Sequence, residues 1–372
     1  ESLAVSPGLH VERASASKAA QLRRARSGDI ESVLFRSTRA GKVAAAWSDA
    51  TLPICTAFWK QSEGMAEDYD LSNDASQADV FVSHSWSPPE NWHLVFPQGT
   101  SYASLKSTML AVVAKDVVLS RGDELKSWRD VSFWVDKACI PQDDLQLKLH
   151  CIGLIERFIS RCDRICILFT WSYLERLWCV FEWACVLMCK EPKQLWLQNE
   201  MFVTEQSLPL YIECIRYFSL KRAKCFLETD REILAKKIDE CYASHQAFEK
   251  LVKATATALM ARSMAFRAGR SARLRRQFFE PWVELAEDLG FSELAASLQS
   301  CRPAEWRETA AATDAKDQSP QAGTGEQPSR TSPTKEKLLS ITTSKYHTAI
   351  EDWFNQSVSP VLLALRKEVV KA

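Results

Sequence analysis

Short apolar runs alternate with longer stretches of helical periodicity between residues 78 and 230. The runs are typical of strands, and the one at 164–170 is almost continuously apolar, as expected for a parallel strand covered on both faces. The longer stretches place apolar side chains three and four residues apart, which predicts helices. Strands are predicted at 79–83, 131–135, 164–170, 194–197 and 224–227, and helices at 102–119, 145–162, 177–189, 208–218 and 230–242.

This alternation predicts an α/β fold, with a flavodoxin-like five-stranded parallel sheet in the order 2-1-3-4-5 and helices on both faces. A helical extension is expected to follow the sheet. Ligands of such sheets bind outside the carboxyl ends of strands one and three. The groups expected to line that crevice are Ser83, His84, Ser85, Trp86, Asp136, Lys137, Thr170, Trp171 and Ser172.

The rest of the chain divides by composition around this predicted 78–230 domain. Residues 1–77 are weakly patterned and predict a partly helical leader, whereas 231–302 are helical in pattern. A disordered linker is predicted at 303–337, because residues 307–337 contain no Ile, Leu, Val, Met or aromatic residue. A C-terminal helix is predicted at 338–372.

Charge and cysteine usage narrow the class of protein. Lysine plus arginine and aspartate plus glutamate number 47 each, which argues against nucleic acid as a partner. The longest apolar run, 177–189, is too short to span a bilayer. No signal peptide is recognisable, and the chain lacks an initiator Met, which suggests a fragment. The twelve cysteines lie mostly in apolar runs without any CxxC pair, so we expect a reduced, cytoplasmic protein without a metal site.

Arginines gather in the predicted helical extension. The cluster comprises Arg262, Arg267, Arg270, Arg273, Arg275 and Arg276. It fits a solvated helix face, and it also fits a patch for an anionic lipid, a nucleic acid or an acidic protein.

Glu182 is the chemically unusual residue of the predicted domain. It lies within an apolar helix, and its neighbours three and four positions away offer no ion-pair partner. A buried carboxylate without a partner costs several kcal/mol. Glu182 therefore has a tertiary partner, reaches solvent in a cleft, or both. The residue is a candidate for a functional site, and a purely structural carboxylate is the alternative.

Four segments, in order, resemble those of Toll/interleukin-1 receptor (TIR) domains. The resemblance covers roughly residues 78–230, and the last segment is similar to the plant-type pattern ending in Trp-Cys-x-x-Glu. The segments are Asp79–Ser85, which resembles the first strand; Trp134–Ile140, the second strand and BB loop; Cys162–Phe169, the third strand; and Tyr173–Glu182.

The resemblance implies a specific activity. Many TIR domains cleave NAD⁺ at the nicotinamide–ribose bond, and their essential glutamate occupies the position of Glu182. NAD⁺ is then a substrate, and no cofactor is needed. Ser85 and Trp86 fall where family members contact the nucleotide, and Lys137 falls where it can approach a phosphate. Trp178 either positions Glu182 or packs in the core.

The alternative function is a non-enzymatic TIR scaffold that signals by homotypic association. Animal receptor and adaptor TIR domains generally lack the glutamate, so its presence favours the enzyme. The chain departs from the family pattern at His84–Trp86, where the plant-type arginine is absent, and at Pro141–Asp144, where the usual Arg-Gly pair is missing. The ordinary pKa of His84 suits a catalytic acid or base. The alternative is a structural role, in which His84 ends the strand within a hydrogen-bonded turn.

Overall fold

A computed structural model describes residues 33–62, 64–122, 127–225, 228–269, 271–301 and 345–371. The predicted linker at 303–337 lies outside these residues, as do the first part of the predicted leader and the start of the predicted C-terminal helix.

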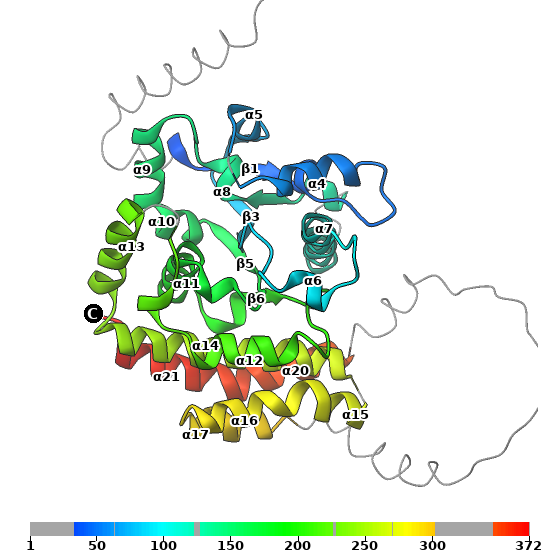
Figure 1. Cartoon of the computed structure of the whole chain (residues 1–372), viewed down its shortest axis with the longest axis vertical. Helices are drawn as coiled ribbons and strands as arrows, with labels where there is room; N and C mark the ends of the chain where they lie inside the picture. Colours follow the sequence, from blue (N-terminus) through cyan, green and yellow to red (C-terminus); the bar gives the residue numbers. More distant parts are fainter. Residues whose placement is uncertain are drawn as a thin grey trace, which may run out of the picture.

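A mixed six-stranded sheet forms the centre of the α/β fold, in the order β2-β1-β4-β3-β5-β6 (Figure 1). Its four parallel strands are the first four strands that the sequence predicts, with bounds that differ by a few residues. They are β3 (Ala78–His84), β4 (Ser132–Trp134), β5 (Cys162–Leu168) and β6 (Leu195–Gln198). The α/β class is therefore confirmed, and the purely parallel five-stranded sheet is wrong.

Two short antiparallel strands extend the sheet beyond β4. β1 (Arg36–Arg39) pairs with β4 and with β2 (Ser72–Asp74), so the sheet begins within the segment that the sequence assigns to a leader. Arg36 links the two strands, because Nε donates to Ser72 Oγ at 2.7 Å and Nη1 to Asp74 at 2.9 Å. Strands of three and four residues without alternating apolar side chains give no periodic signal in the sequence.

The predicted fifth strand at 224–227 is absent among the described residues. Lys224 makes only an isolated parallel bridge with Arg176, and residues 226–227 are not described. The sheet ends instead at β6, and α14 (His245–Ala268) packs along this strand. Arg262 of α14 donates from Nη1 to the carbonyl oxygen of Leu195 at 3.2 Å, which satisfies a group on the sheet edge.

Helices cover both faces of the sheet (Figure 1). α4 (Leu52–Lys60) and α7 (Tyr102–Arg121) lie on one side, and α10 (Ile155–Ser160) and α11 (Leu177–Cys189) lie on the other. The single helix predicted at 145–162 is broken, because the chain leaves helical geometry at Leu154 between α9 (Leu145–Gly153) and α10. Short helices complete this part of the chain: α3 (Ala40–Val43), α5 (Ala66–Tyr69), α6 (Trp92–Val95) and α8 (Asp136–Cys139), with 3₁₀ turns at Trp128–Asp130, Tyr173–Glu175, Pro192–Gln194 and Leu220–Arg222.

The C-terminal helices pack beneath the β6 edge around α14, which is buried over most of its length (Figure 1). The end of the chain returns to the residues before α14, where Ala243 N donates to Val369 O and Lys371 N to Cys241 O, each at 2.9 Å. The remaining elements are α12 (Leu208–Arg216), α13 (Glu228–Cys241), α15 (Ala272–Leu274), α16 (Glu280–Asp288), α17 (Ser292–Gln299), α20 (Lys345–Trp353) and α21 (Ser359–Val369), with π-helical turns at Arg275–Phe279 and Phe354–Val358.

The arginine cluster is partly used by this packing. Arg262 is buried and pairs with Glu351 of α20. Arg267 donates to Val203 O at 2.5 Å and lies over the ring of Phe278. The remaining described arginines of the cluster are exposed or half-buried, and Arg270 lies outside the described residues. An anionic partner for the cluster stays a prediction, and these contacts leave fewer of its charges for one.

Candidate functional site

Glu182 finds its partner at the carboxyl end of β3. The residue is 5% exposed, and Ser83 Oγ donates a hydrogen bond to Oε2 of its carboxyl group. The Tyr173 hydroxyl contacts the same Ser83 oxygen and lies 3.3 Å from the carbonyl oxygen of Cys179, one helical turn before Glu182. Ser83 thus provides the tertiary partner that an isolated carboxylate in an apolar helix requires, and Tyr173 contacts Ser83 in turn.

Burial raises the pKa of Glu182 well above its ordinary value of 4.5, and the nearby Asp136 carboxylate raises this pKa further. The Ser83 hydrogen bond acts in the opposite direction, because it stabilises the ionised form. The protonated form of Glu182 therefore persists to higher pH than in an exposed glutamate. A neutral carboxyl group can donate a hydrogen bond as well as accept one.

Asp136 is the second carboxylate of the site and follows β4. It accepts from Trp86 Nε1 at 3.0 Å and from the backbone amide of Lys137 at 2.7 Å. Burial also raises the pKa of Asp136, although both hydrogen bonds favour its ionised form. Asp136 and Glu182 raise each other's proton affinity, as expected for two carboxylates that share a weakly solvated site.

His84 ends β3 with its side chain enclosed. Neither ring nitrogen has a hydrogen-bond partner, and Asp136 Oδ1 lies 3.7 Å from Nε2. The ring meets Trp59 and Trp86 edge-on, at centroid distances of 4.8 and 4.3 Å. Burial, together with the charge of Lys106, holds the pKa of His84 well below 6.5, so the ring is neutral at pH 7.

The structure brings Ser85 and Trp86 close to these carboxylates. Ser85 is buried, and its hydroxyl donates to Ser87 O at 3.0 Å. The Trp86 ring stacks on Trp59 and links this loop to Asp136 through its indole nitrogen. Both residues therefore lie where the sequence places them, at the carboxyl end of the first parallel strand.

Lys137 is engaged elsewhere. Its Nζ donates to the carbonyl oxygens of Phe58 at 3.0 Å and Gln61 at 3.3 Å, and lies 3.2 Å from Asp68. These acceptors belong to the N-terminal segment at the end of α4 and in α5, which the sequence treats as a leader. These contacts account for the burial of Lys137 without any phosphate ligand, because its charge stabilises the C-terminal end of α4.

Trp178 is half-buried, and its ring lies edge-on to Phe181 at 6.0 Å. It is one turn before Glu182 on α11. The edge-on contact with Phe181 favours the packing role over contact with a substrate.

Lys106 is the residue that sequence reasoning missed. It is fully buried on α7, and its Nζ donates to the carbonyl oxygens of Ser85 at 3.0 Å and Trp86 at 3.5 Å. The signal was present in the sequence, because the neighbours of Lys106 three and four positions away in the predicted helix offer no ion-pair partner. The argument applied to Glu182 would also have selected this residue.

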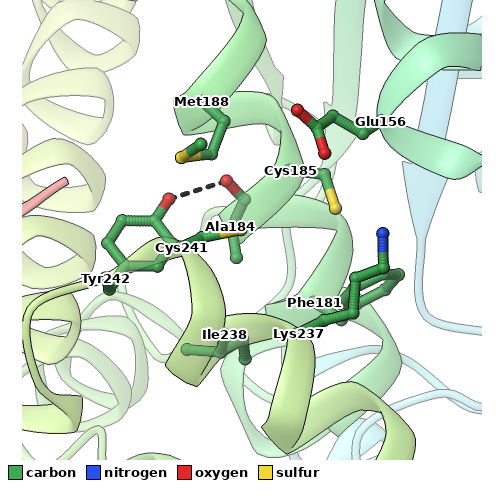
Figure 2. Close-up of a pocket in the computed structure, with 9 residues that line it drawn as sticks. All are labelled: Glu156, Phe181, Ala184, Cys185, Met188, Lys237, Ile238, Cys241 and Tyr242. Carbon is green, nitrogen blue, oxygen red and sulfur yellow. Dashed lines mark hydrogen bonds between the residues drawn. The ribbon is translucent and has the colours of Figure 1, made fainter. Parts of the chain in front are cut away.

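A small cavity lies on the far side of α11, between α10 and α13 (Figure 2). Tyr242 crosses it and donates from its hydroxyl to Ala184 O at 2.7 Å. Its volume of about 10 Å³ suits one water molecule and no nucleotide. Its lining consists of Glu156, Phe181, Ala184, Cys185, Met188, Lys237, Ile238, Cys241 and Tyr242. Glu182 is not among these residues, so the cavity is separate from the candidate site.

No group of histidine, cysteine, aspartate and glutamate side chains in the described part of the chain is arranged to hold a metal ion. None of the described helices combines the length and apolarity needed to cross a bilayer. No protein-family model, curated protein or solved structure matches the chain.

Proposed function

We propose that this protein cleaves NAD⁺ at the nicotinamide–ribose bond, with Glu182 as the catalytic carboxyl group. The observation that carries the proposal is the position of Glu182, which meets Ser83 at the carboxyl end of the central strand β3. Ligands of open parallel sheets bind at these strand ends. The resemblance of four segments to TIR domains supports the same residue. The twelve cysteines are all free thiols, and we propose the cytoplasm as the compartment.

The chemistry needs one strategically placed carboxyl group. The bond between ribose C1′ and the nicotinamide nitrogen breaks, and its electron pair leaves with the nicotinamide, which becomes neutral. A water oxygen then bonds to C1′ and releases a proton to solvent, without oxidation or reduction. Glu182 stabilises the oxocarbenium-like ribose when ionised, and it holds the ribose hydroxyls by hydrogen bonds in either protonation state.

Access to Glu182 is the structural requirement of this proposal. Glu182 is buried, with 5% of the residue exposed, so NAD⁺ reaches its carboxyl group only after neighbouring side chains move. TIR-domain activity generally depends on assembly, and we therefore expect turnover at high protein concentration. Ser85 and Trp86 are the proposed nucleotide contacts. Lys137 is proposed to act indirectly, through its hydrogen bonds to the N-terminal segment.

The test measures nicotinamide release by chromatography from concentrated protein incubated with NAD⁺. We expect turnover by the wild type and a loss of roughly 100-fold or more in Glu182→Gln, which keeps the size of the side chain. Glu175→Gln is the matched control, since Glu175 is exposed just before α11, and it should retain full activity. Turnover that survives in Glu182→Gln would rule out the proposed mechanism.

The burial of Glu182 favours a second candidate, the TIR-like scaffold. In that case the carboxyl group only satisfies Ser83, and copies associate through a surface. α9 presents Leu145 and Leu149, which are 65% and 37% exposed and one helical turn apart. The scaffold predicts a concentration-dependent oligomer in sedimentation that Leu149→Lys weakens, and no nicotinamide release at any concentration.

A further inference from the structure

Lys106 occupies a cage of aromatic rings and carbonyl groups directly beneath the loop that follows β3. Its Nζ lies 4.7 Å from the ring centroid of Tyr102, 4.9 Å from Trp59 and 5.1 Å from Trp86. These distances suit cation–π attraction, which strengthens where water is excluded. The side chain is 0% exposed, so these contacts replace hydration of the ammonium group.

Two hydrogen bonds from Lys106 fix the backbone of this loop. Nζ donates to Ser85 O and Trp86 O, and the Tyr102 hydroxyl donates to the same Ser85 oxygen at 3.1 Å. The backbone position in turn places the Trp86 indole, which donates to Asp136. Lys106 therefore connects α7 to the candidate site through the loop backbone and the Trp86 ring.

We propose that Lys106 is a positioning residue, and that its ammonium form holds Ser85 and Trp86 in place beside the carboxylates of the site. An ammonium group has three donors and no lone pair, which suits two carbonyl oxygens and three ring faces. A neutral amine loses one donor and all of the cation–π attraction. The inference rests on the proposed function only in treating Ser85 and Trp86 as nucleotide contacts.

The surroundings allow this proton to be lost near neutral pH. Burial lowers the pKa of Lys106 to about 7, while the charge of Asp136 opposes this shift and that of Lys137 adds to it. The other titratable groups around the ammonium are His84 on β3, Cys179 on α11 and Tyr102 on α7 itself. Burial holds each of these three in its neutral form at pH 7.

The test follows the Trp86 indole by NMR in protein labelled with ¹⁵N-tryptophan, where thirteen indole signals are expected and Trp86→Phe identifies one of them. In the wild type we expect this resonance to titrate with a midpoint near 7, the pKa of Lys106. Lys106→Met should abolish the titration and Lys106→Arg should also abolish it, because guanidinium stays charged. Asp136→Asn should shift the midpoint to lower pH, since it removes a stabilising charge.

The position of the resonance separates the two Lys106 variants. Lys106→Arg should keep the low-pH chemical shift, and Lys106→Met should adopt the high-pH shift throughout. A titration near pH 7 that persists in Lys106→Met would overturn the proposal. So would a Lys106→Met signal identical to the low-pH wild type, because the loop would then hold its place without the ammonium group.

Activity gives a second, independent readout. If NAD⁺ is cleaved, we expect KM to rise roughly tenfold in Lys106→Met at pH 6, the equivalent of one lost charged hydrogen bond, with partial rescue by Lys106→Arg. A KM unchanged in Lys106→Met contradicts the positioning role. Absence of cleavage in the wild type refutes the proposed function alone, since the indole titration does not depend on NAD⁺.

Discussion

Two single residues define the candidate site, and burial shifts their pKa values in opposite directions. Glu182 retains its proton to higher pH than usual, and Lys106 releases its proton at lower pH than usual. Each lies on the buried face of its helix. Each forms a hydrogen bond with a group at or just after the end of β3. The carboxyl end of one strand thus organises both ionisable groups.

Glu182 should make unfolding free energy depend on pH. Between pH 4.5 and its raised folded pKa, the unfolded chain releases a proton that the folded protein keeps, so stability falls as pH rises. Glu182→Gln has no such proton. We therefore expect the stability of Glu182→Gln relative to wild type to increase from pH 4.5 to 8 in denaturant titrations.

Glu175→Gln provides the control, because its exposed side chain should leave the pH profile of the wild type unchanged. His84 contributes to the profile in both proteins and cancels in the comparison, whereas the Asp136 contribution also changes, because its carboxylate interacts with that of Glu182. Parallel profiles for wild type and Glu182→Gln would contradict the raised pKa.

At the scale of elements, one ion pair joins α14 to α20. Arg262 donates from Nε to Glu351 at 3.0 Å, its guanidinium lies over Phe354, and the two side chains are 7% and 22% exposed. The same arginine reaches the β6 edge through Leu195 O. A single side chain therefore connects the sheet, its covering helix and the C-terminal helices.

Removal of one member of this pair should cost more than replacement of both. Glu351→Ala leaves a buried guanidinium without its carboxylate, and we expect a loss of about 3 kcal/mol in unfolding free energy. In a cycle of the wild type, Arg262→Met, Glu351→Met and the double variant, the double variant should lose less than the sum of the two single changes. Urea titrations of the four proteins measure the coupling, and strict additivity would show that the pair contributes nothing.

The parts of the fold that the sequence predicts are those with strong periodicity. β3, β5, α7 and α11 carry long apolar patterns, and the need of Glu182 for a tertiary partner followed from its neighbours alone. That partner, Ser83, was already among the residues assigned to the strand end. Local pattern and topology together were sufficient for the centre of the site.

Other features depend on contacts between distant segments and escaped prediction. β1 and β2 are short and polar, and they are held together by contacts between distant segments: Arg36 of β1 bonds Ser72 of β2, and β1 pairs with β4. Lys137 faces the N-terminal helices through Asp68, a partner that nothing in its own segment indicates. Of the strand predicted at 224–227, the described residues show one isolated parallel bridge between Lys224 and Arg176, and residues 226–227 lie outside them.

For the whole molecule, the C-terminal segment 345–371 belongs to the same packed body as the sheet. Its Ile350, Phe354, Val358 and Leu362 are each at most 1% exposed within the core. α21 also donates from Arg366 to Lys190 O at 3.0 Å, next to the end of α11. The end of the chain therefore supports the helix that carries Glu182.

A chain that stops at residue 301 should consequently be less stable than the full chain. We expect a lower Tm and stronger binding of a hydrophobic dye, because the α14 surface loses its apolar cover. A synthetic peptide of residues 345–371 should raise the Tm again when added in excess. Equal Tm values for the full and shortened chains would contradict this role.

The two borders of the sheet have a consequence for how copies of the protein can meet. β6 is sheltered by α14, and β2 is only three residues long, with Asn73 and Asp74 exposed at its end. Neither border offers a long, flat row of free amide and carbonyl groups to another chain. Growth by adding strands from neighbour to neighbour is therefore disfavoured. Any filament or ring of these molecules is expected to form through helices and loops, whose side chains can select the partner.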